Sequence, residues 1–352
     1  MSAALREQSL ADRLARAISL GGPIPVAHFM ATANTHYYAT RDPLGRAGDF
    51  ITAPEISQMF GELIGLWLAD LWFRMETPAA HYVELGPGRG TLARDALRAM
   101  AMVGLTPPVH FVETSPVLSG LQREAVSDAL FHTDMSTLPD DVPLFVVANE
   151  FFDALPVHQL IKHEGMWHQR LIGCQDDAFV PMIGNPVPVD IIPDTLRDSP
   201  DASVIESSPA CVAIMRALTE RIVRQGGVML IIDYGYKGPA IGDTLQAVKT
   251  HQVANPFTNP GEQDLTAHVD FETLAAACEL GGARVLGPVG QGQWLTRLGL
   301  AERTVALIAV SPDRADDFAG QRDRLASGNG MGDLFKVMAV TAPSWPEPDG
   351  FG

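Results

Sequence analysis

The sequence has few cysteines and lacks a cysteine or histidine metal motif. Its three cysteines, Cys174, Cys211 and Cys278, lie far apart and form no Cys-x-x-Cys pair. An odd, widely spaced set predicts neither a disulfide framework nor a zinc knuckle, and it fits a reducing compartment. The ten histidines are scattered and include no His-Glu-x-x-His run, so no metal site is predicted.

Positive charge and long apolar runs are also scarce. The chain has 25 Lys and Arg against 42 Asp and Glu, a formal net charge of -17. This surplus disfavours nucleic acid and anionic membranes as partners. No apolar run reaches membrane-spanning length, and the first residues lack the apolar core of a signal peptide. With 46% hydrophobic residues, the sequence predicts a globular protein without membrane insertion.

A glycine-rich turn at residues 86–90 is the feature around which the chain is organised. An apolar run leads to Glu84, three glycines then alternate with other residues, and a helical run follows from Leu92 to Val103. Strand, glycine turn and helix in this order are typical of the first unit of a nucleotide-binding α/β fold. The glycines permit a sharp turn and let a ligand lie against bare backbone.

Three details of this turn argue against a dinucleotide or a phosphate as its ligand. Thr91 stands where a dinucleotide fingerprint needs its third glycine, and no Gly-Lys-Ser/Thr sequence follows. Pro87 removes a backbone N–H that a phosphate would use. Glu84 adds negative charge, which suits a ligand with a cationic centre, and S-adenosylmethionine fits. An ordinary packing turn is the alternative, and an NAD-dependent oxidoreductase is a weaker one.

Acidic residues follow the next two predicted strands. Glu113 ends a strand that begins at Val109, and an acid in this place holds the ribose hydroxyls in dinucleotide and adenosylmethionine enzymes. Asp134 follows a short strand at residues 129–132, where its carboxylate can accept a hydrogen bond from the adenine amino group. A solvated turn explains Asp134 equally well.

The fourth predicted strand, Pro143 to Ala148, is continuously apolar, as a buried parallel strand should be. It runs straight into Asn149 and Glu150. Ligands in open α/β sheets bind at the carboxyl ends of strands, so these two residues are predicted to lie beside the glycine turn. Simple capping of the strand end is the less favoured alternative.

The N-terminal part of the chain is predicted to be helical. Helices are expected at residues 5–20 and 26–34. A loop from Tyr37 to Phe50 follows, and it is too long for a mere connector. Its aromatic residues predict an ordered loop that either covers a ligand or packs on the surface. Thr52 and Glu55 have capping-box spacing at the start of one long apolar helix through residue 71.

The later segments predict an α/β domain with a β-rich insertion at about residues 157–205. A hairpin at Glu164-Gly165 opens the insertion, whereas residues 179–192 read as irregular. A helix from Pro209 and a strand that runs into Asp233-Tyr234 follow. Residues 245–261 read as loop, and the tail, residues 341–352, is predicted to be flexible.

Several sequence blocks resemble the MidA family of methyltransferases, whose mitochondrial members help assemble respiratory complex I. The resemblance runs from about Gly21 to Val340, and its long blocks are specific. One departure is Tyr236, where histidine is expected. The matching blocks are residues 22–24, 48–52, 54–58, 84–90, 149–156, 264–271, 287–292 and 331–337.

This resemblance implies a class I, Rossmann-like α/β fold that binds S-adenosylmethionine. The implied domains are an N-terminal helical cap at residues 1–76 and a methyltransferase domain at residues 77–340. For mitochondrial members it implies symmetric dimethylation of an arginine in a complex I subunit. The partner would then be an arginine-bearing protein, in the matrix for eukaryotic relatives and in the cytoplasm for a bacterial chain. A small-molecule methyltransferase and a non-catalytic assembly chaperone that binds S-adenosylmethionine are the alternatives.

Together these arguments define a candidate site. Glu150 and Asp153 are the first candidates to orient a guanidinium and accept its proton, with Asn149 beside them. Asp49 and Glu55 are the second candidates. The predicted acceptor-binding residues are Glu55, Tyr38, Phe151 and Tyr234. The predicted cofactor-binding residues are Glu84, Gly86, Pro87, Gly88, Gly90, Glu113, Asp134, Asn149, Gly48, Asp49 and Phe50.

Overall fold

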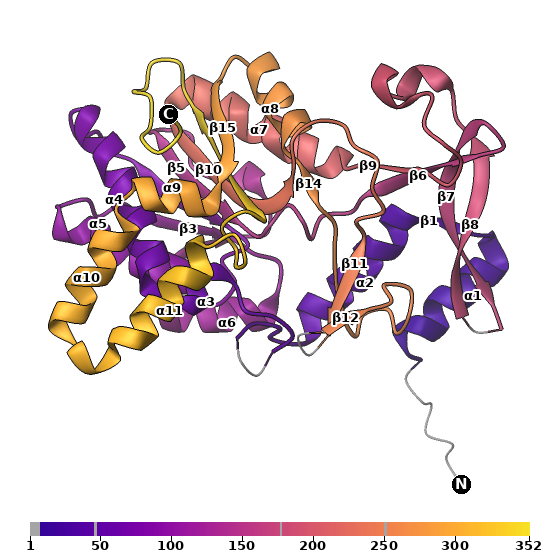
Figure 1. The fold of residues 1–352 in the computed structure, drawn as a ribbon, viewed down its shortest axis with the longest axis horizontal. Helices are drawn as coiled ribbons and strands as arrows, with labels where there is room; N and C mark the ends of the chain where they lie inside the picture. The colour runs from indigo at the N-terminus through magenta and orange to yellow at the C-terminus, as the bar shows by residue number, and fades with distance from the viewer. Residues whose placement is uncertain (1–7, 46–47, 177, 250–251) are drawn as a thin grey trace, which may run out of the picture. The chain divides into compact units, whose positions relative to one another are not determined.

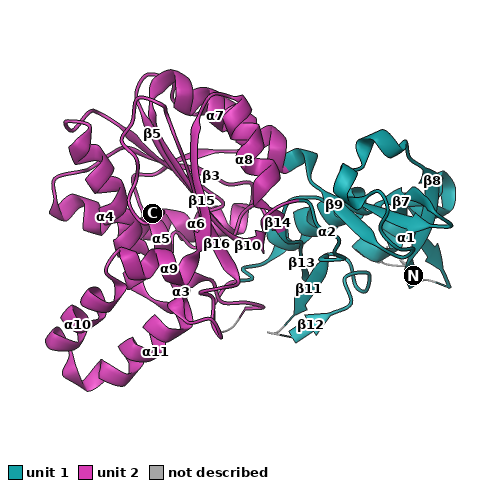
Figure 2. Cartoon of the chain, turned by 45° about the horizontal axis from the view of Figure 1, so that its top comes forward, with its two compact units in different colours: residues 1–43, 154–210, 239–268 teal, residues 44–153, 211–238, 269–352 magenta. Residues whose placement is uncertain are grey.

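The computed structural model describes residues 8–45, 48–176, 178–249 and 252–352. The chain divides into two compact units, which Figure 2 colours separately. Unit 1 comprises residues 1–43, 154–210 and 239–268, and unit 2 comprises residues 44–153, 211–238 and 269–352. The predicted cap of residues 1–76 is therefore split at residue 43, and its first part folds with the insertion.

Unit 1 contains two small antiparallel sheets. The first has the order β1 (Ile24–Pro25), β7 (Met166–Gln175), β6 (His158–His163) and β9 (Val204–Ser207), with β8 (Ala178–Pro186) also paired to β7. The second has the order β12 (Gln252–Ala254), β11 (Gln246–Lys249) and β13 (Asp264–Thr266). The short 3₁₀ helices η2 (Val189–Ile191) and η3 (Asp194–Leu196) precede β9.

The hairpin predicted at Glu164-Gly165 is confirmed, because it joins β6 to β7. The irregular segment and the loop predicted further on are wrong in part, since they contain β8, β11 and β12. Strand β8 pairs with β7 alone among the described strands. Its prolines, Pro181 and Pro186, made this strand hard to predict from the sequence. An edge strand tolerates proline because the backbone positions on its outer side need no N–H group to bind a neighbouring strand.

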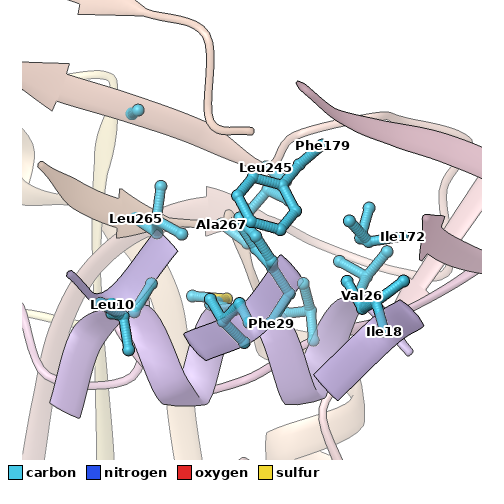
Figure 3. Packing of buried hydrophobic residues seen from close by; sticks show 14 residues of the cluster. Leu10, Ile18, Val26, Phe29, Ile172, Phe179, Leu245, Leu265 and Ala267 are labelled. Atoms are coloured by element: carbon cyan, nitrogen blue, oxygen red, sulfur yellow. The ribbon is translucent and has the colours of Figure 1, made fainter. Parts of the chain in front are cut away.

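Two helices cover the sheets of unit 1. Helix α1 (Leu10–Gly21) starts at a capping box formed by Ser9 and Asp12; the predicted residues 5–7 lie outside the described part. Helix α2 (Val26–Thr40) continues beyond its predicted end, so Tyr37 and Tyr38 are helical and the following loop is shorter than expected. Figure 3 shows the resulting core, in which Leu10, Ile18, Val26 and Phe29 pack with Ile172, Phe179, Leu245, Leu265 and Ala267.

Unit 2 is built on a mixed sheet of order β15-β16-β10-β5-β2-β3-β4 (Figure 1). Its strands are β2 (His81–Leu85), β3 (Val109–Val112), β4 (Leu130–His132), β5 (Leu144–Asn149), β10 (Gly227–Tyr236), β15 (Arg284–Gly290) and β16 (Phe335–Thr341), and β14 (Val269–Asp270) pairs with the end of β10. Strands β4, β3, β2, β5 and β10 are parallel, and β16 is antiparallel to both neighbours.

Helices cover both faces of this sheet, as right-handed crossovers require. Helices α4 (Gln58–Arg74), α5 (Thr91–Met102) and α6 (Pro116–Ala125) lie on one face, and α7 (Pro209–Gln225) and α8 (Phe271–Leu280) lie on the other (Figure 1). The remaining helices are α9 (Gln291–Arg297), α10 (Leu300–Val310), η4 (Pro312–Arg314) and α11 (Ala315–Ala326). Among the described residues, none of the helices has the length and apolar character that crossing a membrane requires.

The single long helix predicted from Thr52 is wrong, because the chain forms α3 (Ala53–Ile56) and then α4. Ser57 separates them with an extended backbone, and its hydroxyl accepts the N–H of Met59. The predicted capping box is also wrong, since Thr52 makes no side-chain cap bond within the described residues. The N–H of Ala53 donates instead to the Glu150 carboxylate, which lies 97 residues away in the sequence.

The C-terminal residues pack against unit 2, although the sequence predicts a flexible tail. Trp345 is 3% exposed. The ring of Phe351 lies 6.5 Å from that of Trp67 and 6.4 Å from that of Trp294. Trp67 also donates its indole N–H to the carbonyl of Asp349 at 2.9 Å. Burial of these large aromatic surfaces holds the segment in place.

Candidate active site

The order of the parallel strands reverses between β2 and β5. From β2 the chain moves outward to β3 and β4, whereas β5 lies on the other side of β2 and is followed by β10. Such a reversal leaves a crevice at the carboxyl ends of the two strands. Leu85 pairs with Ala148, so the glycine turn and Asn149 lie side by side, as predicted from the sequence.

The glycine turn has a backbone that only glycine adopts readily. Gly86, Gly88 and Gly90 have φ angles of 57°, 57° and 76°. A Cβ atom would lie 3.0 Å from the ring of Phe151 at Gly86, and 2.7 Å from the side chain of Leu44 at Gly88. The turn is therefore a cradle of bare backbone, which an added side chain would fill.

The segment that follows unit 1 in the chain is held to this cradle by Arg89. The Arg89 guanidinium donates to the carbonyl of Leu44 at 2.5 Å and lies 3.7 Å from a Glu55 oxygen. Glu55 also accepts the hydroxyl of Thr91 at 2.5 Å. The carboxylate predicted to bind the acceptor thus joins α3 to the glycine turn in this structure.

Gly48, Asp49 and Phe50 belong to the same segment. The N–H of Gly48 and the carbonyl of Phe50 both bond to the backbone of Gly45, each at 3.0 Å. The predicted loop also includes Arg46 and Ala47, which lie outside the described residues. The roles predicted for Gly48, Asp49 and Phe50 at the cofactor remain predictions.

Glu84 lies beneath the turn rather than on its surface. Its side chain is buried, with 3% of the residue exposed, and it accepts the hydroxyl of Tyr82 at 2.6 Å. Burial raises the pKa of Glu84 to about 8, which outweighs the opposite effect of this hydrogen bond. The negative charge expected from the sequence is therefore largely absent at neutral pH in the protein alone. A nearby cation would lower the pKa, because it stabilises the ionised carboxylate.

We expect Glu84 to make the protein less stable as the pH rises. Between its ordinary pKa of 4.5 and its folded value of about 8, the folded state binds more protons than the unfolded chain. The free energy of unfolding therefore falls across this window. Glu84→Gln keeps the size and the oxygen that Tyr82 needs, so at about pH 9 its free energy of unfolding should exceed that of the wild type by on the order of 5 kcal/mol. Urea unfolding at about pH 5 and about pH 9 measures this, and parallel pH dependences in the two proteins would contradict it.

Glu113, the predicted ribose ligand, is held by its own loop and by Gln122. Its carboxylate accepts the N–H groups of Thr114 and Ser115 at 2.8 and 2.7 Å, and the Gln122 amide at 2.9 Å. The same amide donates to the carbonyl of Gly88 at 2.8 Å. Buried Gln122 thus links the acid to the glycine turn. It was not predicted, and its only sequence signal is its place four residues after Leu118 on the inward side of α6.

Asp134 is exposed and caps the short helix η1 (Met135–Thr137). Its carboxylate accepts the N–H of Ser136 at 2.7 Å and also the hydroxyl of that residue. These hydrogen bonds lower the pKa of Asp134. The structure gives Asp134 this local role, and its contact with adenine remains a prediction.

Strand β5 ends at Asn149, and Glu150 follows it with an unusual backbone. Glu150 has a φ of 50°, which is rare outside glycine and is often kept at functional sites. Its carboxylate accepts the N–H of Ala53 and the amide of Asn149, both at 3.2 Å. The amide oxygen of Asn149 is buried and has no hydrogen-bond partner among the described residues. A buried acceptor of this kind is suited to a ligand that donates.

Asp233, near the end of β10, binds the turn that follows β5. Its carboxylate accepts the N–H groups of Phe152 at 3.0 Å, Asp153 at 3.2 Å and Tyr234 at 2.9 Å. Burial, together with the negative charges of Asp153 and Glu150, raises the pKa of Asp233 well above its ordinary range. Three carboxyl groups therefore gather at this edge. Asp233 was not predicted as a site residue, although it follows a continuous apolar strand as Glu150 does.

The predicted aromatic residues fall in both units. Phe151 lies over Gly86, and the Tyr234 ring stands edge-on to Phe335 with centroids 5.5 Å apart, all within unit 2. Tyr38 belongs to unit 1, where its hydroxyl donates to Asp264 at 2.8 Å. The acceptor-binding roles of Phe151, Tyr234 and Tyr38 remain predictions.

The residues present fit S-adenosylmethionine. The cradle offers bare backbone to an extended ligand, Glu113 follows the neighbouring strand, and the buried Asn149 oxygen can accept from an amino group. The described residues contain no group of His, Cys, Asp and Glu that could hold a metal ion. A sheet of this order, with a crevice where the strand order reverses, defines the class of doubly wound α/β proteins that bind a nucleotide-type ligand at that edge.

Comparison with known proteins names the family. Residues 63–289 match the family described as "Putative S-adenosyl-L-methionine-dependent methyltransferase", and the chain belongs to this family. The Drosophila melanogaster "Protein arginine methyltransferase NDUFAF7 homolog, mitochondrial" is 37% identical, over 94% of this chain and 84% of that protein. The human "Protein arginine methyltransferase NDUFAF7, mitochondrial" is 34% identical, over 91% of this chain and 80% of that protein.

A solved structure supports the same fold. The crystal structure of a Burkholderia thailandensis protein bound to S-adenosyl-homocysteine superposes with a TM-score of 0.87 at 27% identity, covering 97% of this chain and 94% of that one. The class I methyltransferase fold implied by the resemblance is confirmed. The protein is an S-adenosylmethionine-dependent methyltransferase.

Proposed function

We propose that this methyltransferase acts on an arginine side chain of a protein. Two observations support this acceptor. The Drosophila and human relatives are named protein arginine methyltransferases. Within unit 2, Glu150 and Asp153 lie on one turn beside the glycine cradle, and this placement is the main structural observation in support of the proposal. Carboxylates suit a guanidinium because they can accept two of its N–H groups at once.

The cofactor is proposed to lie on the backbone of Gly86, Pro87, Gly88 and Gly90. Glu113 would accept the ribose hydroxyls, and the free oxygen of Asn149 would accept an amino group. The other proposed cofactor ligands are Glu84, Asp134, Gly48, Asp49 and Phe50. When bound, S-adenosylmethionine supplies a methyl group on a sulfonium, so the protein's main task is to align the acceptor with it.

The carboxylates then have two tasks. They orient the planar guanidinium, which is cationic at neutral pH because its pKa is far above 7. They also accept the proton that the nitrogen loses once it carries the methyl group. Glu150 and Asp153 are proposed for both tasks, with Asp49 and Glu55 as the second candidates. Phe151 and Tyr234 would cover the acceptor and keep water away.

The finer proposal is symmetric dimethylation of an arginine in a respiratory complex I subunit. This finer proposal is based on the sequence resemblance and on the names of the relatives, which describe them as mitochondrial. The reaction would take place in the cytoplasm if the chain is bacterial, and in the matrix for the eukaryotic relatives.

Methyl transfer to peptides tests this function. We expect radiolabelled S-adenosylmethionine to label arginine-containing peptides of complex I subunits, and mass spectrometry of the products to show symmetric dimethylarginine. Peptides with lysine in place of arginine serve as the control and should remain unlabelled. Label on small molecules alone would favour the small-molecule alternative. Stable binding of a subunit without any transfer would favour an assembly chaperone.

A further inference from the structure

We propose that Asp233 is a positioning residue for methyl transfer. From the end of β10, its carboxylate fixes the turn at residues 150–153 and so sets the direction in which Glu150 faces the acceptor. The acceptor's identity rests on the proposed function. The anchoring of the turn does not rest on the proposed function, because it follows from hydrogen bonds within unit 2.

The anchor uses both oxygens of Asp233. One oxygen accepts the N–H groups of Phe152 and Asp153, and the other accepts the N–H of Tyr234 in its own strand. A neutral amide at this position would offer a single oxygen to three donors and would turn an NH₂ group toward them. The carboxylate is therefore the side chain that can hold the turn and the strand together.

The turn needs such an anchor because its first residue is strained. Glu150 has left-handed backbone, which costs free energy in any residue with a Cβ atom and persists only where surrounding contacts fix it. The N–H of Glu150 donates to the carbonyl of Ile232 at 2.8 Å, directly before Asp233. Residues 232 and 233 therefore hold the turn at its beginning and at its end.

Several features depend on this one geometry. The Glu150 carboxylate reaches the N–H of Ala53, and the ring of Phe151 lies against Gly86 of the cradle. A turn released from Asp233 would shift both side chains. The position of Asp233 also places its carboxyl group next to Glu150 and Asp153, the two residues proposed to contact the acceptor.

Asp233→Asn tests the proposal, with Glu206→Gln as the matched control. Glu206 is also a buried carboxylate that accepts two successive backbone N–H groups, those of Thr244 and Leu245 at 3.1 and 3.2 Å, but it belongs to unit 1. Each variant replaces a buried carboxyl group that accepts two successive backbone N–H groups with the corresponding neutral amide. We expect Asp233→Asn to lower kcat about 30-fold, with S-adenosyl-homocysteine binding within about three-fold, and Glu206→Gln to stay within about two-fold of wild type.

A double-mutant cycle separates positioning from general damage. If Asp233 acts through Glu150, Asp233→Asn should cause little further loss of kcat in a Glu150→Gln background. An unchanged 30-fold loss in that background would overturn the proposal. So would full activity of a folded Asp233→Asn protein.

Hydrogen exchange provides a readout that needs no acceptor. The N–H groups of Phe152 and Asp153 should exchange faster in Asp233→Asn, whereas those of Thr244 and Leu245 should not. If wild type fails to methylate arginine, the proposed function fails, and this exchange pattern still decides whether Asp233 holds the turn. Unchanged protection of Phe152 and Asp153 would overturn the anchor itself.

Discussion

Glu150→Gln is expected to lower the rate of methyl transfer to an arginine peptide by at least about 100-fold, in line with the loss of a positioned general base. Glutamine keeps the size of the side chain and an oxygen for the N–H of Ala53. It loses the charge that pairs with a guanidinium and the basicity that takes its proton. Binding of S-adenosyl-homocysteine, measured by calorimetry, should stay within about three-fold of wild type, since the cradle is untouched.

The control for this variant is Glu164→Gln. Glu164 has nearly the same backbone, with a φ of 49°, but it lies exposed in the hairpin of unit 1. Its replacement should leave transfer unchanged. Asp153→Asn is the companion variant, because Asp153 stands on the same turn. Full transfer by both Glu150→Gln and Asp153→Asn would remove these two residues from the mechanism and make Asp49 and Glu55 the next to test.

Gly88→Val is expected to weaken S-adenosyl-homocysteine binding at least about 100-fold. A Cβ atom at this position would lie 2.7 Å from the side chain of Leu44, on the surface proposed to receive the ligand. Valine would also have to adopt a φ of 57°, which costs a β-branched residue about 1–3 kcal/mol. Calorimetric titration measures the loss, and thermal unfolding shows whether the variant is folded.

Gly104→Val is the control for this variant, because it distinguishes the effect of backbone strain from the loss of the ligand-binding surface. Gly104 also has left-handed backbone, with a φ of 89°, but a Cβ atom there meets nothing within 4 Å among the described residues. This variant should lose some stability and bind the ligand normally. Unchanged binding by Gly88→Val would show that the cofactor does not lie on the glycine turn.

The parts of the site that could be predicted have local causes. Glycines alternating after an apolar run predict a turn with positive φ, and Gly86, Gly88 and Gly90 have it. A continuous apolar run predicts a buried parallel strand, and the residue after it must then lie at the carboxyl edge of the sheet. Glu150 was placed beside the glycine turn for that reason, and the pairing of Leu85 with Ala148 agrees.

Other elements could not be predicted because long-range packing overrides their local signals. Strand β8 contains prolines, and only its position at the edge of a sheet makes it possible. The C-terminal segment is rich in proline and glycine, yet Trp345 and Phe351 find aromatic and apolar partners far away in the sequence. Composition alone predicts a flexible tail in such a case.

The sequence by itself therefore determined the class of fold, the glycine cradle and the edge of the sheet at which polar residues gather. These features depend on residue type and on spacing along the chain. Only the tertiary structure decided that Gln122 joins Glu113 to Gly88, and that Asp233 holds the turn of Glu150. These hydrogen bonds join residues 9, 34 and 81 positions apart, and a buried polar side chain shows its partner only once the chain has folded around it.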